Sequence, residues 1–234
     1  MGMWRNQVVP RATDLLLDTV EVRRLRQEAL AGAFGEVVEV GFGSGLNLAS
    51  YPPAVTKVLA VEPSKVALRL AARRISSRRV PVELVGLDAQ ELALESSSVA
   101  CAVSTFTLCT VPSPSRTLEE LLRVLEPGGT FHFLEHGLSP VAGVARWQRR
   151  LNPLQRRLGG GCQLDRPIDR LVREAGFLLR ELRFEQMGGP RALQPFGYLY
   201  LGVATKPGGC GSEVRTPERC DTGSGPPFTP LSSS

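Results

Sequence analysis

The stretch Glu39-Val40-Gly41-Phe42-Gly43-Ser44-Gly45 decides how this chain folds. It closes the apolar run at 36–40, which predicts a buried strand, and its three glycines at alternate positions favour a sharp turn. Because glycines carry no side chain, they also allow the backbone to approach a ligand closely. The sequence therefore predicts a strand, a glycine-rich turn that opens a helix, and a ligand site beside that turn.

Strands and helices are predicted to alternate along the rest of the chain. Four further strands are expected at 57–61, 82–85, 99–103 and 130–134, with helices at 64–76 and 117–125. The second helix ends at Pro127-Gly128-Gly129, which is a typical stop signal. Strands that are separated by helices imply right-handed crossovers and a mostly parallel sheet.

The alternation changes after residue 135. A helix is predicted at 143–151, Asn152-Pro153 breaks it and starts a short second helix, and a third helix spans 167–175. The strands at 177–186 and 197–205 have only the loop at 187–195 between them, so they are expected to pair as an antiparallel hairpin. The predicted fold class is α/β: a Rossmann-like, doubly wound, seven-stranded, mostly parallel sheet with an antiparallel C-terminal hairpin.

Length and composition predict one folded domain with a tail. The 234 residues divide into an N-terminal helical segment at 1–33, a domain at 34–206 and a tail at 207–234. Of the 28 tail residues, 15 are Gly, Pro or Ser, which predicts disorder. No stretch contains the roughly 18 apolar residues that a membrane-spanning helix needs, and no signal peptide is visible. A cytoplasmic protein is expected.

The cysteines and the charge favour neither a metal site nor a nucleic acid partner. The five cysteines are odd in number and widely spread, and no pair has Cys-x-x-Cys spacing, so no metal is expected. A formal net charge of +5 is mild. Because no nucleic-acid-binding motif accompanies it, we expect a small-molecule partner and no nucleic acid.

A second acidic residue, after Glu39, indicates that the ligand is a nucleoside. Glu62 lies 21 residues after Gly41, at the end of the second predicted strand, where a carboxylate accepts hydrogen bonds from both ribose hydroxyls. A dinucleotide dehydrogenase is the rival, but its Gly-x-Gly-x-x-Gly fingerprint needs glycine where Leu46 stands. No Gly-Lys-Ser/Thr follows the turn, so it is not a P-loop either. A mononucleoside ligand fits better.

Residues 36–136 resemble the class I S-adenosylmethionine-dependent methyltransferases. Five motifs match in order: Glu39-x-Gly-x-Gly-x-Gly45, Glu62 after strand two, Asp88-Ala-Gln-Glu-Leu92 after strand three, Ser104–Thr107 after strand four, and Leu125-Glu-Pro-Gly-Gly129 before strand five. A terminal antiparallel hairpin also agrees with that family. Without this resemblance, Glu39 and Asp88 would be interpreted as a strand-end acid and a helix cap.

The resemblance implies a role for each motif residue. The glycines of the turn would pass under the methionine and ribose portions of S-adenosylmethionine, Glu39 would orient the methionine amino group, and Glu62 would hold the ribose. Asp88 and the backbone N–H of Ala89 would bind adenine, and Ser104 and Thr105 would line the sulfonium end. The full implied cofactor-binding set is Glu39, Gly41, Phe42, Gly43, Ser44, Gly45, Glu62, Pro63, Asp88, Ala89, Ser104 and Thr105.

A finer resemblance suggests the methyl acceptor. Asn47–Pro52, Leu108–Val111, Phe133–His136, Asn152-Pro153 and Gly161–Leu164 are similar to the mammalian alkyl-thiol methyltransferases and their bacterial relatives. It implies methylation of a small molecule, with a thiol as the first candidate. The alternatives are a quinone or phospholipid methyltransferase and, from another class, a non-catalytic nucleoside-binding protein with this fold.

Two further predictions concern catalysis and surface contacts. His136 follows strand five and is the best candidate base, with Glu135 as its orienting or substrate-binding neighbour; a structural role for each is the alternative. His132 is expected to be a histidine of the sheet face. The Arg-rich segment 143–158 is predicted to be a solvated basic face, with weak contact to an anionic membrane surface as the alternative.

Overall fold

A seven-stranded sheet forms the centre of the protein. The computed structural model describes residues 4–78, 80–188 and 191–208. The strands are β1 (Gly35–Val40), β2 (Val55–Val61), β3 (Val82–Gly86), β4 (Val99–Thr105), β5 (Leu125–His136), β6 (Leu178–Gln186) and β7 (Tyr198–Thr205). Their order is β3-β2-β1-β4-β5-β7-β6. The first five strands are parallel and β7 pairs antiparallel with β5 and β6, so the predicted sheet and hairpin are confirmed.

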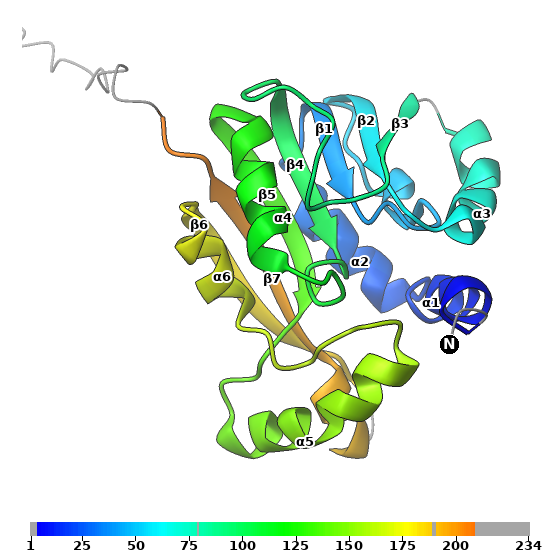
Figure 1. Ribbon diagram of the computed structural model, residues 1–234, viewed down its shortest axis with the longest axis vertical. Helices are drawn as coiled ribbons and strands as arrows, with labels where there is room; N and C mark the ends of the chain where they lie inside the picture. The colour runs from blue at the N-terminus through cyan, green and yellow to red at the C-terminus, as the bar shows by residue number, and fades with distance from the viewer. Residues whose placement is uncertain (1–3, 79, 189–190, 209–234) are drawn as a thin grey trace, which may run out of the picture.

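Helices cover both faces of this sheet. They are α1 (Val9–Leu16), α2 (Val20–Leu30), α3 (Lys65–Ser76), α4 (Pro114–Val124), α5 (Ala142–Leu158) and α6 (Ile168–Glu174), with short helical turns η1 (Trp4–Val8), η2 (Leu46–Ala49) and η3 (Arg191–Phe196). Figure 1 shows α4 and α6 over one face, α2 behind the sheet, and α5 beyond the end to which β1 and β4 point. The part of the predicted tail at 209–234 lies outside the described residues.

Apolar side chains fill the space on each side of the sheet. Leu118 of α4 and Ile168 of α6 pack with Phe131 and Phe133 of β5. On the opposite face, Leu30 of α2 and Ala71 of α3 pack with valines of β1, β2 and β4. The central parallel strands are therefore buried on both faces, which explains why their sequences are continuous apolar runs.

Polar caps determine where the helices begin. The Ser64 hydroxyl accepts from the Ala67 N–H at 3.2 Å, as the sequence predicts for the start of α3. Helix α4 begins at Pro114, three residues earlier than predicted, because Ser113 caps it and proline suits the first helical turn. The helix also ends at Val124 rather than at residue 125. Leu125 already belongs to β5, and 127–129 form an irregularity between Leu125, paired with Val99, and Thr130, paired with Cys101.

The predicted break at Asn152-Pro153 is wrong. Helix α5 continues through Pro153 to Leu158 although proline removes one backbone hydrogen bond. The Asn152 side chain does not cap a new helix. Instead its Oδ1 accepts from the Leu164 N–H at 2.9 Å and its Nδ2 donates to Asp165 at 2.7 Å, so the asparagine ties α5 to the following loop.

Two connections also differ from the predictions. The glycine-rich turn opens the single 3-10 turn η2 instead of an α-helix, because Pro52 and Pro53 follow closely and disfavour helical backbone before them. The hairpin connection contains η3 where only a loop was expected. Within the described ranges, no helix combines the length and the apolar character required to cross a membrane.

We expect Gly202→Ala to lower the free energy of unfolding by about 1–3 kcal/mol, because a Cβ in β7 would lie 2.5 Å from the Phe133 ring and 2.7 Å from the Glu181 carbonyl. Gly143→Ala is the matched control in the first turn of α5, where a Cβ meets nothing within 4 Å. It should raise stability by up to about 1 kcal/mol. Urea unfolding measures both, and equal effects would contradict the packing of β7 between β5 and β6.

Candidate functional site

An open cavity of about 970 Å³ lies at the carboxyl ends of the parallel strands. In the sheet register, Val40 of β1 faces Val61 of β2 and Ser104 of β4, so these three strands end at the same level. Open α/β sheets bind ligands at this position. The walls come from α1 with the flanking residues Gln7 and Leu17, Arg26 of α2, the glycine-rich turn, the 61–69 stretch, 87–89, 105–112 and 159–160.

The glycine-rich turn requires glycine for two reasons. Gly41, Gly43 and Gly45 all have positive φ angles, of 70°, 58° and 75°, which other residues rarely adopt. In addition, a Cβ on Gly41 would lie 1.9 Å from the Thr107 hydroxyl oxygen. The turn and the segment after β4 therefore approach each other more closely than any side chain permits.

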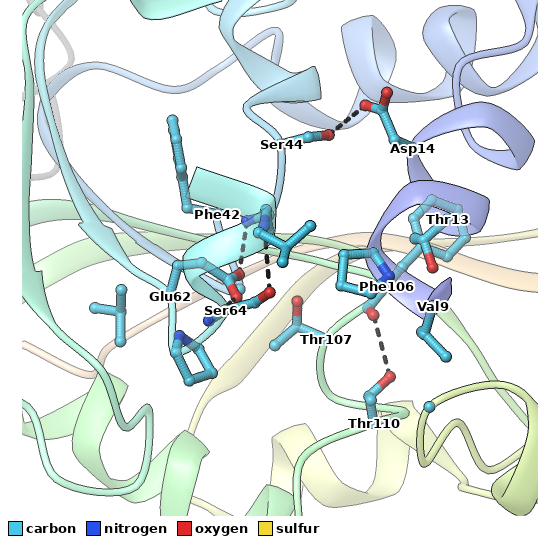
Figure 2. A pocket seen from close by; sticks show the side chains of 18 of the residues that line it. Val9, Thr13, Asp14, Phe42, Ser44, Glu62, Ser64, Phe106, Thr107 and Thr110 are labelled. Carbon is cyan, nitrogen blue, oxygen red and sulfur yellow. Dashed lines mark hydrogen bonds between the residues drawn. The ribbon is translucent and has the colours of Figure 1, made fainter. Parts of the chain in front are cut away.

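Glu62 stabilises this turn from beneath. Its Oε2 accepts from the Gly43 N–H at 2.8 Å and its Oε1 accepts from the Ser64 N–H at 2.7 Å (Figure 2). Burial raises the pKa of Glu62, and the two backbone hydrogen bonds oppose this shift. Each carboxylate oxygen has a further lone pair, so Glu62 can also accept hydrogen bonds from a ligand in the cavity, whose wall it forms.

The predicted adenine residues and the turn residues other than Gly45 also line the cavity. Asp88 is exposed there, and its Oδ1 accepts from the Gln90 N–H at 2.9 Å, which lowers the pKa of Asp88. Ala89 is buried beside it. Phe42, Ser44 and Pro63 contribute to the wall as well.

A buried polar network stands behind the turn. Asn47 Nδ2 donates to Glu39 at 2.7 Å and Tyr51 donates to the other Glu39 oxygen at 2.7 Å. Burial raises the pKa of Glu39 to about 7. Glu39 is not among the cavity-lining residues, and it reaches the cavity only through its partners: Arg26 donates to Asn47 Oδ1 at 2.5 Å and to Thr105 at 2.8 Å.

Arg26 is a cavity residue that sequence reasoning missed. It lies on α2, outside the matched motifs, and it is 4% exposed while lining the cavity. Burial lowers the pKa of Arg26 to about 10, so the guanidinium is charged at neutral pH. Its Nε has no hydrogen-bond partner among the described residues. No local sequence signal distinguishes it, because Arg23, Arg24 and Arg26 occur in one short stretch.

Glu135 is fully buried and organises the segment after β4. Its Oε1 accepts from Ser104 Oγ at 2.7 Å and from the backbone N–H groups of Thr107 and Leu108 at 2.9 and 3.0 Å. Burial is the largest influence on the carboxyl group and raises the pKa of Glu135. Neither Glu135 nor Ser104 is among the cavity-lining residues. The geometry supports a positioning role for this carboxylate.

The N-terminal helix α1 closes one side of the cavity. Ser44 donates to Asp14 at 2.5 Å, which links α1 to the glycine-rich turn (Figure 2), and Arg74 of α3 forms a 2.8 Å ion pair with the same carboxylate. The 159–160 segment lies against the start of helix α1, where a Cβ on Gly160 would lie 2.7 Å from the Val9 side chain. The sequence predicts helices in this segment but gives no indication that they form a cavity wall.

His136 lies at the end of β5, partly exposed, and does not line the cavity. Its ring packs against Phe106 with centroids 4.9 Å apart, and its Nδ1 is 3.9 Å from the Cys162 sulfur. His132 lies on the sheet as predicted: its Nδ1 is 2.9 Å from the Ala29 carbonyl oxygen, and burial lowers its pKa.

Comparison with known proteins agrees with this arrangement. Residues 38–133 match the family described as methyltransferase domain. The chain is 34% identical over 183 residues to thiol S-methyltransferase TMT1B of Rattus norvegicus, an alignment that spans 76% of this chain and 74% of the relative.

Two bacterial relatives match over shorter stretches. Demethylmenaquinone methyltransferase of Clavibacter sepedonicus is 33% identical, over 50% of this chain and 48% of the relative. Phosphatidylethanolamine N-methyltransferase of Cereibacter sphaeroides is 31% identical, over 53% of this chain and 62% of the relative.

The fold is shared with solved structures of SAM-dependent methyltransferases. One from Methanosarcina mazei has a TM-score of 0.57 and 23% identity, and the comparison covers 74% of this chain and 92% of that chain. Fold and site together define a Rossmann-like enzyme of the class I methyltransferase type. The chain belongs to the methyltransferase family that includes the TMT1B thiol S-methyltransferases.

The raised pKa of Glu39 predicts a pH-dependent stability. The folded carboxyl group holds its proton up to pH about 7, whereas the unfolded chain loses it near 4.5. The free energy of unfolding should therefore fall as the pH rises between these values, by on the order of 2–3 kcal/mol. Glu39→Gln should remove this part of the pH dependence, because its amide oxygen still accepts from Asn47.

Glu36→Gln is the matched control, since Glu36 is exposed on the same strand. It should leave the wild-type pH profile unchanged. Urea unfolding at several pH values from 4.5 to 8 measures the three proteins. Identical slopes for wild type and Glu39→Gln would contradict the assignment of Glu39 as a titrating buried carboxyl group.

Proposed function

We propose that this protein transfers a methyl group from S-adenosylmethionine to a small-molecule acceptor, with a thiol as the first candidate. The observation that carries the cofactor assignment is Arg26, whose charged guanidinium lines the cavity with its Nε unpartnered among the described residues. A buried donor without an acceptor costs about 1–3 kcal/mol. The carboxylate of an amino acid ligand would supply both the acceptor and the opposite charge.

The remaining cavity residues fit the other portions of this cofactor. The glycine-rich turn leaves room for a ligand directly above the backbone, and Glu62 has lone pairs free for a ribose diol. The exposed Asp88 carboxylate can accept from the exocyclic amine of adenine. Glu39 acts indirectly in this arrangement, because it holds Asn47, which in turn holds Arg26.

S-adenosylmethionine supplies a methyl group on a positively charged sulfur, which is already a good leaving group. The protein therefore has to align the acceptor with that methyl group and exclude water. Helix α1 and the 159–160 segment border the cavity and serve the second task. A thiol acceptor, with a pKa of about 8.5, needs only slight help to lose its proton, whereas a carbon or hydroxyl acceptor needs a true base.

The thiol acceptor is supported by the relative that matches over the greater part of both chains, whose name is thiol S-methyltransferase. A quinone or a phospholipid is the second candidate, because two relatives that match over about half of this chain carry those activities in their names. A non-catalytic nucleoside-binding protein would bind the cofactor and transfer nothing to any acceptor.

Two predictions about location and surface contact stay predictions. Arg146, Arg149, Arg150, Arg156 and Arg157 are exposed along α5, and Arg150 lies over the Trp147 ring, 5.6 Å from its centre. This face suits either water or an anionic membrane surface. A cytoplasmic location is proposed because three buried cysteines, Cys101, Cys109 and Cys162, are free thiols.

The first test combines two variants with two ligands. Arg26→Met should weaken binding of S-adenosylhomocysteine by about 10–150-fold, because a charged hydrogen bond of about 1.5–3 kcal/mol is lost. It should spare methylthioadenosine, which has no carboxylate. Asp88→Ala should weaken both ligands, because both contain adenine. Isothermal calorimetry measures the affinities.

Glu91→Ala provides the matched control, since Glu91 is exposed nearby and does not line the cavity. It should bind both ligands as the wild type does, and none of the proteins should bind NAD. If Arg26→Met weakens both ligands equally, Arg26 does not contact the carboxylate. Binding of NAD without S-adenosylhomocysteine would replace the methyltransferase assignment with a dehydrogenase.

The second test addresses transfer itself. Wild-type protein with S-adenosylmethionine should methylate one or more members of a panel of small alkyl and aryl thiols, measured by mass spectrometry of the thioether. His136→Ala should lower turnover at least about tenfold while leaving the affinity for S-adenosylhomocysteine unchanged, as expected of a residue that acts on the acceptor. Full activity of the variant would show that His136 is structural.

A further inference from the structure

Two thiols and an imidazole meet beside the cavity, although they come from distant parts of the sequence. Cys109 lies in the segment after β4, His136 ends β5, and Cys162 follows α5. Their ligand atoms all lie within 4.8 Å of one another. We call these three residues the thiol–imidazole cluster. Their separations of 27 and 26 residues explain why no sequence motif reveals them.

Two distances within the cluster match those of a tetrahedral metal site. With zinc–sulfur bonds of about 2.3 Å, two tetrahedral sulfur ligands lie about 3.8 Å apart, and a sulfur and a nitrogen ligand about 3.6 Å apart. The Cys109 and Cys162 sulfurs are 3.7 Å apart, and the Cys162 sulfur is 3.9 Å from His136 Nδ1. These two distances agree with tetrahedral zinc coordination to within a few tenths of an ångström, and all three ligand atoms lie within 4.8 Å of one another.

We propose that Cys109, His136 and Cys162 bind a thiophilic divalent cation of the zinc type, with the fourth position left to a ligand from solution. The two sulfurs are buried, and the imidazole is the more accessible ligand. Two thiolates neutralise the charge of the cation, and Arg166 and Glu135 act on the pKa of the Cys162 thiol in opposite directions. Sets of three protein ligands with one open position are typical of catalytic zinc sites.

Neighbouring contacts hold the cluster in place. The Arg166 guanidinium donates to the Leu108 carbonyl, and the Gln163 N–H donates to the Cys109 carbonyl at 2.8 Å. Glu135 accepts from the Cys109 N–H at 3.3 Å. The segments that carry the two cysteines are therefore tied to each other before any ion binds. A disulfide would involve the two sulfurs alone and would not account for the adjacent imidazole of His136.

The site borders the place where the acceptor has to bind. Thr110 and Gly160, which lie one and two residues from the cluster cysteines, line the cavity. A thiol that coordinates such an ion loses its proton. This consequence rests on the proposed function, and it would make His136 a metal ligand where the sequence predicts a base. The metal site itself does not depend on the identity of the acceptor.

Cobalt(II) is the probe for this proposal, because thiolate ligands give it intense near-ultraviolet charge-transfer bands and tetrahedral geometry gives strong visible bands. Full-length protein, reduced with a phosphine and stripped by a chelator, is titrated with cobalt(II) in the absence of oxygen. We expect one equivalent to produce both sets of bands and zinc to displace it. Cys109→Ser, Cys162→Ser and His136→Ala should each lose or markedly shift these bands.

Two control proteins keep the result specific. Cys101→Ser removes a buried thiol outside the cluster, and Cys210→Ser/Cys220→Ser removes the two tail thiols, which lie outside the described residues; both should bind cobalt(II) like the wild type. Thermal unfolding verifies that each variant folds. If a cysteine variant does not fold, the wild-type spectrum and the partly exposed His136→Ala decide the question.

Three results would overturn the proposal. The first is a wild-type titration without thiolate charge-transfer bands, and the second is a band that survives both cluster cysteine variants. The third is reduced protein that binds no cobalt(II) while air oxidation joins Cys109 to Cys162, which would indicate a redox pair instead. Because none of these readouts requires methyl transfer, failure of the thiol assay and failure of the metal site are separate outcomes.

Discussion

The close approach of two backbone segments at the end of β1 sets the shape of the site. Gly41 leaves no space for a side chain because the Thr107 hydroxyl occupies it. Glu135 in turn fixes Thr107 and Leu108 by accepting their backbone N–H groups. One buried carboxylate and one missing side chain therefore determine how the segment after β4 passes over the glycine-rich turn. A shift of this segment would move the cavity wall and Cys109 together.

The buried charged residues near this contact, Glu39 and Arg26, suit a ligand-binding role better than a purely structural one. Burial raises the pKa of Glu39 and lowers the pKa of Arg26, so each charge is destabilised by the interior, while their electrostatic attraction opposes both shifts. Replacing such a pair by apolar residues would often be neutral or stabilising. The pair instead holds a guanidinium at the cavity with an unused donor. Stability alone does not explain such an arrangement, whereas the proposed contact with a carboxylate of the ligand would.

The sequence predicted those features that depend on local patterns. Apolar runs identified the strands, Ser64 marked a helix start, and the glycine spacing located the turn. Local rules failed where distant contacts compensate for a local cost, as when Asn152 joins the following loop and α5 continues through Pro153. They also failed for residues that only tertiary structure brings together. Arg26 is one of several arginines in its stretch, and the thiol–imidazole cluster combines three separate segments.

The division between residues inside and outside the family match bears on function. The family match covers 38–133, which contains the glycine-rich turn, Glu62 and Asp88, and so contains the residues suited to a nucleoside cofactor. Helix α1, the 159–160 wall and Cys162 all lie outside that range. Methyl transfer from a sulfonium requires little from a protein beyond alignment of the acceptor with the methyl group, so one core fold can serve many methyl acceptors. The chemistry that selects an acceptor then has to come from the segments that close the cavity. In this chain Cys162 and His136, outside the matched range, meet Cys109 of the segment after β4 at the cavity edge, where an ion bound in the proposed metal site would coordinate a soft ligand such as a thiolate.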